Sequence, residues 1–251
     1  MAAYPRIVDQ AIVVLTGGSS GIGLATARQL EGRVGRLIVH GLDGDTVRGD
    51  YRELASVAGT AERIAELTDR VDVLINNAGI PGPPRRTVTA DGHEVTLQVN
   101  LLAGALLTDL LLPLIPETGR VVNVASATHY SASLDLDDLE LERGSYSPVR
   151  AYAHSKLALV TYSTWLAGEL AQDVVSVHPG VIGTGLLHAM FGPGGAPVER
   201  AASVLVDLAG RELESGAYYD EHEPAAPNPD ALDRGSQERL ARYVEAAIRR
   251  R

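Results

Sequence analysis

The sequence contains no cysteine, and that absence excludes disulfide bonds and thiolate metal sites. A chain without disulfides suits a reducing compartment, so we expect a cytoplasmic protein. Its 7 histidines include no pair at the spacing of metal ligands, and we therefore expect no metal site. Positive charge is also scarce, since 22 lysine and arginine residues are outnumbered by 32 aspartate and glutamate residues. The net charge of -10 would repel phosphate backbones, which argues against nucleic acid as a partner.

Long apolar runs are missing as well. The longest, residues 101–115, is too short to span a bilayer and contains Asp109. The N-terminal segment carries Arg6 and Asp9 and no apolar stretch, so we expect neither a secretory signal nor a membrane partner. At the other end, the arginines of residues 249–251 close an amphipathic segment. We interpret them as favourable charge at a helix C-terminus rather than as a partner site.

What remains is the composition of a globular protein, with 45% hydrophobic and 22% charged residues. Short apolar runs rich in β-branched residues alternate with segments of helical periodicity. This alternation predicts an α/β fold with one doubly wound parallel sheet of the Rossmann type, and without repeats or linkers we expect residues 1–251 to form a single domain. The predicted strands are 11–16, 37–39, 71–75, 120–124 and 174–177, and the predicted helices are 52–67, 91–112, 152–170 and 199–208.

A glycine-rich turn follows the first predicted strand. The segment from Thr16 to Gly23 reads TGGSSGIG. Glycines at 17, 21 and 23 permit a tight turn and a close approach of the backbone to a pyrophosphate, and the helix that follows offers free N–H groups to that anion. The spacing differs from G-x-G-x-x-G, but the strand, turn and helix around it are the required context. The sequence therefore predicts a dinucleotide site.

Polar residues follow two more strands. Asn76-Asn77-Ala78-Gly79 comes directly after strand 71–75, where it is either an ordinary turn or a contact to a ligand beyond the strand ends. Ser126 follows strand 120–124, at a place where its hydroxyl would hydrogen-bond a substrate oxygen.

Tyr152 and Lys156 are four residues apart at the start of a predicted helix, so they share one face. A phenol with a pKa of about 10 is a poor acid/base at neutral pH, and a nearby ammonium favours its ionised form. We therefore expect Tyr152 to exchange a proton with the oxygen held by Ser126.

Together these segments resemble, in order and over nearly the whole chain, the motifs of the short-chain dehydrogenase/reductase family. Asn100 in LQVN matches the family's active-site asparagine, and Pro179-Gly180, with Thr184 following, matches its Pro-Gly motif. The resemblance implies a seven-stranded parallel sheet and an NAD(P)-dependent oxidoreductase that moves hydride between a nicotinamide and a carbonyl or alcohol, with a proton relay through Tyr152, Lys156, Asn100 and water. The implied catalytic residues are Asn100, Ser126, Tyr152 and Lys156, and the expected cofactor-binding residues are Thr16, Gly17, Ser19, Ser20, Gly21, Ile22, Gly23, Asp43, Asp50, Asn77, Ala78, Gly79, Tyr152, Lys156, Pro179, Gly180 and Thr184.

The chain departs from the commonest family pattern in two places. The connection between Ser126 and Tyr152 is long and, with AYAHSKLA and SGAYYD, resembles the retinol-dehydrogenase-like branch. Between His40 and Val47 only GLDGDT remains, although a parallel crossover normally needs a dozen residues or more. Either the strand at 47–50 is vestigial or the crossover helix after the second strand is missing.

The same region bears on the choice of cofactor. Leu42 and Ser20 stand where NADP-using relatives often carry basic residues, and Asp43 would repel a 2′-phosphate. The sequence therefore leans slightly to NAD(H), although Arg33, Arg36 or Arg48 would reverse that preference by folding over the site.

The substrate is less clearly marked. The family places its substrate lid after the Pro-Gly motif, and here that segment supplies Leu186, Leu187, Met190 and Phe191. An apolar ketone or alcohol of small to medium size fits such a lid, although these side chains would serve equally for packing. The resemblance also implies a homodimer or tetramer, paired through helices 91–112 and 152–170.

Two other functions share part of this pattern. A cofactor-sensing binding protein would keep the fold and lose the chemistry, but all four implied catalytic residues are present. Sugar-nucleotide epimerases share Tyr-x-x-x-Lys, but they usually carry a larger C-terminal domain than the chain that follows Pro179.

Overall fold

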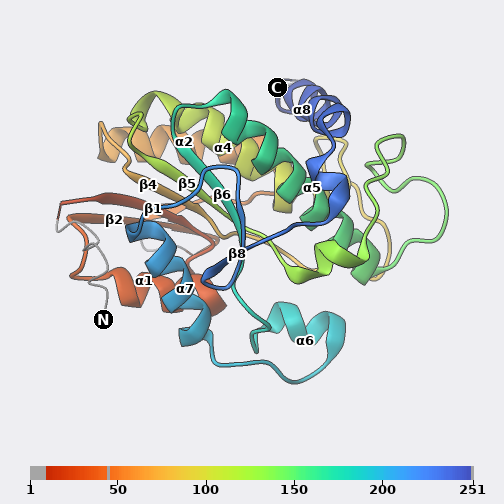
Figure 1. Ribbon diagram of the computed structural model, residues 1–251, viewed down its shortest axis with the longest axis horizontal. Helices are drawn as coiled ribbons and strands as arrows, with labels where there is room; N and C mark the ends of the chain where they lie inside the picture. Colours follow the sequence, from red (N-terminus) through yellow and green to blue (C-terminus); the bar gives the residue numbers. More distant parts are fainter. Residues whose placement is uncertain (1–9, 44–45, 250–251) are drawn as a thin grey trace.

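The computed structural model describes residues 10–43 and 46–249, and it contains one sheet in the order β3-β2-β1-β4-β5-β6-β7-β8 (Figure 1). Strands β1 to β7 are parallel and β8 is antiparallel to β7, so the sheet has one strand more than the resemblance implied. The strands are β1 (Ile12–Thr16), β2 (Arg36–Gly41), β3 (Val47–Arg48), β4 (Val73–Asn76), β5 (Arg120–Val124), β6 (Asp173–His178), β7 (Tyr218–Asp220) and β8 (Glu223–Ala225). The segment in which we expect no secretory signal, up to Asp9, and the last two arginines lie outside the described residues.

Helices cover both faces of the sheet, as its continuous apolar strands require. Alternate side chains of β1 show the two sides, since Val13 and Leu15 belong to one buried cluster and Val14 to the other. Figure 1 shows α1 and α7 on one face and α2, α4 and α5 on the opposite face. These helices are α1 (Gly21–Leu30), α2 (Leu54–Leu67), α4 (Ala103–Leu111), α5 (Pro148–Glu169) and α7 (Val198–Gly210).

The helical segments differ from prediction at their ends. Helix α5 begins at Pro148 rather than at Tyr152, because the Ser147 hydroxyl accepts a hydrogen bond from the Arg150 N–H at 3.2 Å and Pro148 suits the first helical position. The region of the predicted helix 91–112 is divided into consecutive α-helical, π-helical and 3-10 segments. The remaining helical segments are α3 (Val95–Leu97), the π-helical η1 (Gln98–Leu102), the 3-10 turns η2 (Leu112–Leu114), η3 (Ala127–Ser131) and η4 (Pro229–Leu232), α6 (Gly185–Phe191) and α8 (Arg234–Arg249).

The connection from β2 to β3 confirms that the crossover helix is missing. Among the described residues of this connection, 42, 43 and 46, none is helical. Strand β3 has only 2 residues, and they pair with His40 and Gly41 at the end of β2. Because the chain has to return only to the end of β2, a short loop replaces the usual crossover. The strand is therefore vestigial, and the described part of the connection contains no helix.

We expected the apolar run 101–115 to be too short to span a bilayer, but within the described residues most of it belongs to a longer helical stretch, Val95–Leu114, which is long and apolar enough to cross a membrane. Of its most apolar window, 78% is buried inside the protein, as in the core helix of a folded domain.

Helix α8 packs against α5 and α4 (Figure 1). Its side chains Leu240, Val244 and Ala247 are buried in the same cluster as Leu159 and Tyr162 of α5. The outer side of the α4–α5 pair is thus covered by the chain's own C-terminal helix.

Candidate active site

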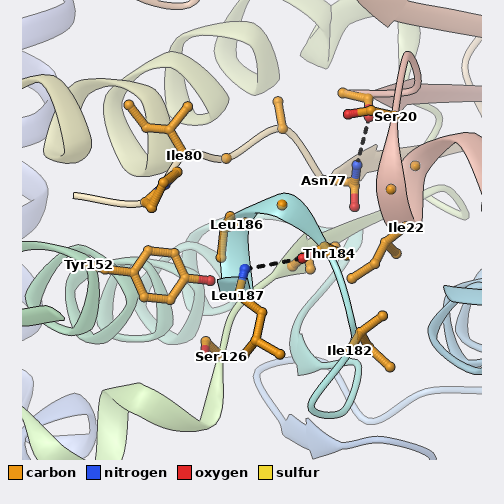
Figure 2. A pocket seen from close by; sticks show the side chains of 18 of the residues that line it. Ser20, Ile22, Asn77, Ile80, Ser126, Tyr152, Ile182, Thr184, Leu186 and Leu187 are labelled. Carbon is orange, nitrogen blue, oxygen red and sulfur yellow. Dashed lines mark hydrogen bonds between the residues drawn. The ribbon is translucent and has the colours of Figure 1, made fainter. Parts of the chain in front are cut away.

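A cavity of about 880 Å³ lies at the carboxyl ends of the parallel strands. Its wall contains most of the predicted site residues, from the glycine turn at one end to Ser126 and Tyr152 at the other. Tyr152 reaches into the pocket from α5, Ser126 from the end of β5, and Leu186 and Leu187 from α6 (Figure 2). Thr16, Asp43 and Asn100 are the predicted residues that do not line this wall.

The glycine turn is shaped by contacts that only glycine permits. Gly17 and Gly21 have φ of +67° and +53°, the left-handed region that favours glycine. A Cβ on Gly23 would lie 2.1 Å from the Gly17 carbonyl oxygen, so no larger residue fits between turn and helix. Ser20 precedes α1 without a side-chain hydrogen bond to the helix end, which leaves the first-turn N–H groups for a ligand. This cradle fits the pyrophosphate of a dinucleotide.

Thr16 and Asn77 fasten this turn to the end of β4. The Thr16 hydroxyl oxygen accepts hydrogen bonds from the N–H groups of Asn77 and Ala78, both at 3.0 Å. The Asn77 side-chain amide donates to the carbonyls of Thr16 and Gly17 at 2.9 and 3.2 Å. Asn77, Ala78 and Gly79 also line the cavity. The Asn-Asn-Ala-Gly segment is therefore more than a turn, while Thr16 is buried behind the wall.

Tyr152 and Lys156 lie together at the cavity wall, both almost fully buried. The Lys156 Nζ is 5.6 Å from the centre of the Tyr152 ring and donates to the Val124 carbonyl at 2.7 Å. Burial raises the pKa of Tyr152 to about 12, and a hydrogen bond with Ser126 only partly opposes this effect. Burial likewise lowers the pKa of Lys156 to about 8. In the protein without ligand, desolvation is thus the main influence on the phenol, and the stabilisation of its ionised form by Lys156 stays a prediction.

Asn100 lies behind the cavity wall, in the π-helical turn η1. Its Oδ1 accepts from the Ile80 N–H at 2.9 Å, and its Nδ2 donates to the Ile80 carbonyl at 3.1 Å and to the Ser155 hydroxyl at 3.0 Å. A Cβ on Gly79 would lie 3.2 Å from that Oδ1 and 3.6 Å from the Lys156 Nζ. Asn100 thus holds the loop that forms the wall, and its side chain is fully engaged there.

Pro179, Gly180 and Thr184 follow β6 and line the cavity opposite the glycine turn. Gly180 has a φ of +100°, which again favours glycine. The Thr184 hydroxyl caps α6 by accepting from the Leu187 N–H at 3.3 Å. A Cβ on Gly21 would lie 3.5 Å from the Thr184 methyl group, so the start of α6 lies close to the dinucleotide cradle.

The two predicted acidic residues, Asp43 and Asp50, differ in their position relative to the cavity. Asp50 lines the cavity, whereas the exposed side chain of Asp43 lies off its wall and pairs with Arg48 at 2.8 Å. The short β2–β3 connection carries Asp43 past the end of the strand without bringing it to the wall. Leu42 lines the cavity in its place.

Several residues of the wall were not predicted from the sequence. His40 and Tyr51 line the same end, with their rings stacked at 4.6 Å between centroids, and burial lowers the pKa of His40 to about 4. Ile80 directly follows the Asn-Asn-Ala-Gly segment, Thr128 lies two residues after Ser126, and both line the cavity. Their place close to a strand end is the signal in the sequence that could have identified them.

Known proteins resemble this chain in sequence and in structure. A family model described as short chain dehydrogenase matches residues 11–135. Human retinol dehydrogenase 13 is 34% identical over 277 residues, covering 94% of this chain and 83% of the relative. A solved structure from Mycobacterium paratuberculosis has a TM-score of 0.80 at 28% identity and covers 99% of this chain and 96% of that one. A blue fluorescent protein from a metagenomic library, solved in complex with NADPH, has a TM-score of 0.68 at 25% identity, with 86% and 97% covered.

A doubly wound sheet with a dinucleotide cradle beside a buried tyrosine–lysine pair defines a nicotinamide-dependent oxidoreductase. The chain belongs to the short-chain dehydrogenase/reductase family, in its retinol-dehydrogenase-like branch. It is accordingly an NAD(P)-dependent enzyme that acts on the CH–OH/C=O couple.

Proposed function

We propose that this enzyme reduces an apolar ketone or aldehyde, or oxidises the corresponding alcohol, with Tyr152 as the acid/base. The observation that carries the proposal is the common pocket of the Tyr152 phenol, the Ser126 hydroxyl and the apolar side chains of α6 (Figure 2). The reacting carbon would lie between the nicotinamide, which supplies or takes the hydride when bound, and these two hydroxyl groups.

In reduction, the substrate oxygen accepts a hydrogen bond from Ser126 and the proton of the Tyr152 hydroxyl, while its carbon gains the hydride. At neutral pH the phenol is protonated, since the pKa of Tyr152 is about 12, and Lys156 is charged, since its pKa is about 8. The ammonium would stabilise the phenolate left after proton transfer. Solvent then returns the proton to Tyr152, which restores the starting state.

Apolar side chains define the substrate end of the cavity. Leu186, Leu187, Met190 and Phe191 of α6 line it opposite Ile80. An isolated charge would lose hydration in such a pocket without gaining a partner, so a neutral apolar substrate of small to medium size fits best. The name of the human relative, retinol dehydrogenase, agrees with this class of substrate.

We also propose a slight preference for NAD(H). On the edge that receives the adenosine, Arg48 pairs with Asp43 at 2.8 Å and Arg52 with Asp50 at 3.8 Å. A 2′-phosphate would have to compete with these carboxylates for the arginines. Leu42, which lines the cavity there, supplies no charge of its own.

Replacement of Tyr152 by phenylalanine tests the chemistry. Tyr152→Phe removes the proton donor and little volume, so we expect turnover to fall by about 100-fold or more while cofactor affinity stays within about twofold. A panel of apolar ketones, aldehydes and alcohols, followed by nicotinamide absorbance with both cofactors, supplies the substrate. Stopped-flow measurement of hydride transfer then compares the two proteins.

The outcomes separate an enzyme from a cofactor-sensing protein. A Tyr152→Phe variant that transfers hydride at nearly the wild-type rate would contradict the role of Tyr152. Tight cofactor binding without turnover of any member of the panel would favour the sensing protein instead.

A further inference from the structure

The hydroxyl oxygen of Ser126 receives two hydrogen bonds from Thr128. Ser126 caps the 3-10 turn η3, and its Oγ accepts from the Thr128 N–H at 3.2 Å and from the Thr128 hydroxyl at 3.1 Å. Thr128 itself lines the cavity and is only partly buried. None of the motifs found in the sequence includes this residue.

A serine hydroxyl has two lone pairs and one hydrogen. When Thr128 occupies both lone pairs, the hydrogen of Ser126 is the one part of the group left for another partner, which is the Tyr152 oxygen in the protein without substrate. We propose that Thr128 is a positioning residue of the active site, which turns the Ser126 hydroxyl so that it donates to the substrate oxygen. This inference rests on the proposed role of Ser126.

The direction of the hydrogen bond between Ser126 and the substrate matters because charge develops on the substrate oxygen. During reduction that oxygen becomes more negative as hydride reaches the carbon, so a fixed donor stabilises the transition state more than the bound ketone. With the opposite polarity, Ser126 would donate to Thr128 and present lone pairs to the same oxygen. Thr128 thus decides whether Ser126 assists or opposes the reaction.

The turn that carries Thr128 is held from behind by other groups. The Ser126 carbonyl accepts from the His129 N–H at 3.1 Å and pairs with the His129 Nδ1 at 2.8 Å. The other ring nitrogen of this buried histidine pairs with the Asn228 N–H at 3.2 Å. Since none of these contacts uses the Thr128 side chain, its replacement by valine leaves the turn in place.

A double-mutant cycle tests the proposal, with decanal as the apolar carbonyl probe. Because Thr128→Val removes one of two hydrogen bonds to Ser126, we expect kcat to fall by about tenfold, with KM and cofactor affinity within about twofold of wild type. Thr128→Ser, which restores a hydroxyl, should return kcat to within about twofold of wild type. In a Ser126→Ala background, Thr128→Val should have no further effect, because the group it positions is gone.

Each result decides the matter. A wild-type kcat in Thr128→Val would overturn the proposal. It would also be overturned if Thr128→Val lowered kcat by the same factor in the wild type and in the Ser126→Ala background. A rise in KM with unchanged kcat would assign Thr128 to substrate binding instead. Tyr152→Phe is measured alongside to separate this inference from the proposed function. A low kcat in Tyr152→Phe together with a wild-type kcat in Thr128→Val refutes only the role of Thr128. A wild-type kcat in Tyr152→Phe refutes the proposed role of Tyr152, whereas a wild-type kcat in Ser126→Ala removes the group on which this inference rests.

Discussion

Burial acts on Tyr152 and Lys156 in opposite directions on the pKa scale, and in both cases it favours the neutral form. The pKa of the phenol rises to about 12 and that of the ammonium falls to about 8. Between these values both groups are neutral in the protein without ligand. Below about pH 8 the lysine is charged, and only then can it stabilise a phenolate or hydrogen-bond a cofactor as a cation.

The family resemblance also implies that Lys156 binds the nicotinamide ribose, so we predict that its ammonium acts on both the phenol and the ribose. Lys156→Ala should lower turnover and weaken cofactor affinity together, the latter by about tenfold, as expected for loss of a charged hydrogen bond. Wild-type affinity should also fall as the pH rises through about 8, where the lysine loses its charge, and this dependence should vanish in the variant. Fluorescence titration with cofactor at several pH values measures both effects.

Lys156→Met is the matched control, because it keeps most of the length of the side chain without its charge. If methionine restored affinity, packing against Val124 rather than charge would be responsible. An affinity unchanged in both variants would remove the ribose from the role of Lys156.

At the scale of elements, the predicted strands were close because buried strands are marked at both ends. Strand β5 begins and ends at Arg120 and Val124, as predicted, between a glycine and the polar turn of Ser126. The predicted helix 91–112 was less accurate, since its continuous apolar pattern contains no boundary. Its first turn begins at Val95, where the Glu94 carboxylate accepts from the Leu97 N–H at 2.8 Å. Glutamate is not a preferred N-cap residue, so the sequence carries little signal for that start.

The site was predictable where it depends on short motifs and less so where it depends on register. The cradle of Gly17, Gly21 and Gly23 follows from local sterics that the sequence displays. His40 lines the cavity because of its position along β2. Thr128 lines the cavity because the turn η3 folds back on Ser126. Such placements depend on pairing between distant segments, which no local pattern specifies.

The β2–β3 connection is the element that governs the cofactor prediction. Wild-type catalytic efficiency should be modestly higher with NADH than with NADPH. Leu42→Arg adds a cation on the cavity wall, and Asp43→Ala frees Arg48 from its partner, so the double variant should shift the ratio toward NADPH by about tenfold or more. Steady-state kinetics with both cofactors in the wild type, the two single variants and the double variant measures each contribution. A wild type that already prefers NADPH tenfold would show that an arginine, rather than Asp43, controls this end.

At the scale of the whole molecule, helix α8 bears on the expected route of self-association. The resemblance implied pairing through helices 91–112 and 152–170, but α8 packs on that side of α5 and α4. Displacing it would expose Leu240, Val244 and Ile248, at a cost of about 1.5 kcal/mol or more for each side chain. A homodimer through the α4–α5 pair would therefore compete with the chain's own helix. A cytoplasmic location and a homodimer or tetramer paired through helices 91–112 and 152–170 stay predictions.

Adjacent alanines of α8 allow a sharp test, because Ala247 is buried against the core and Ala246 is exposed. Ala247→Asp places a charge in the α8 interface, so it should lower the free energy of unfolding by about 2 kcal/mol or more. By loosening α8 it should also uncover the apolar side of α5 and cause self-association, whereas Ala246→Asp should do neither. Light scattering and denaturant unfolding at micromolar concentration measure both properties, each compared with the wild type. A wild-type dimer that can be cross-linked from α5 to α5 of its partner would show that α8 leaves this face open.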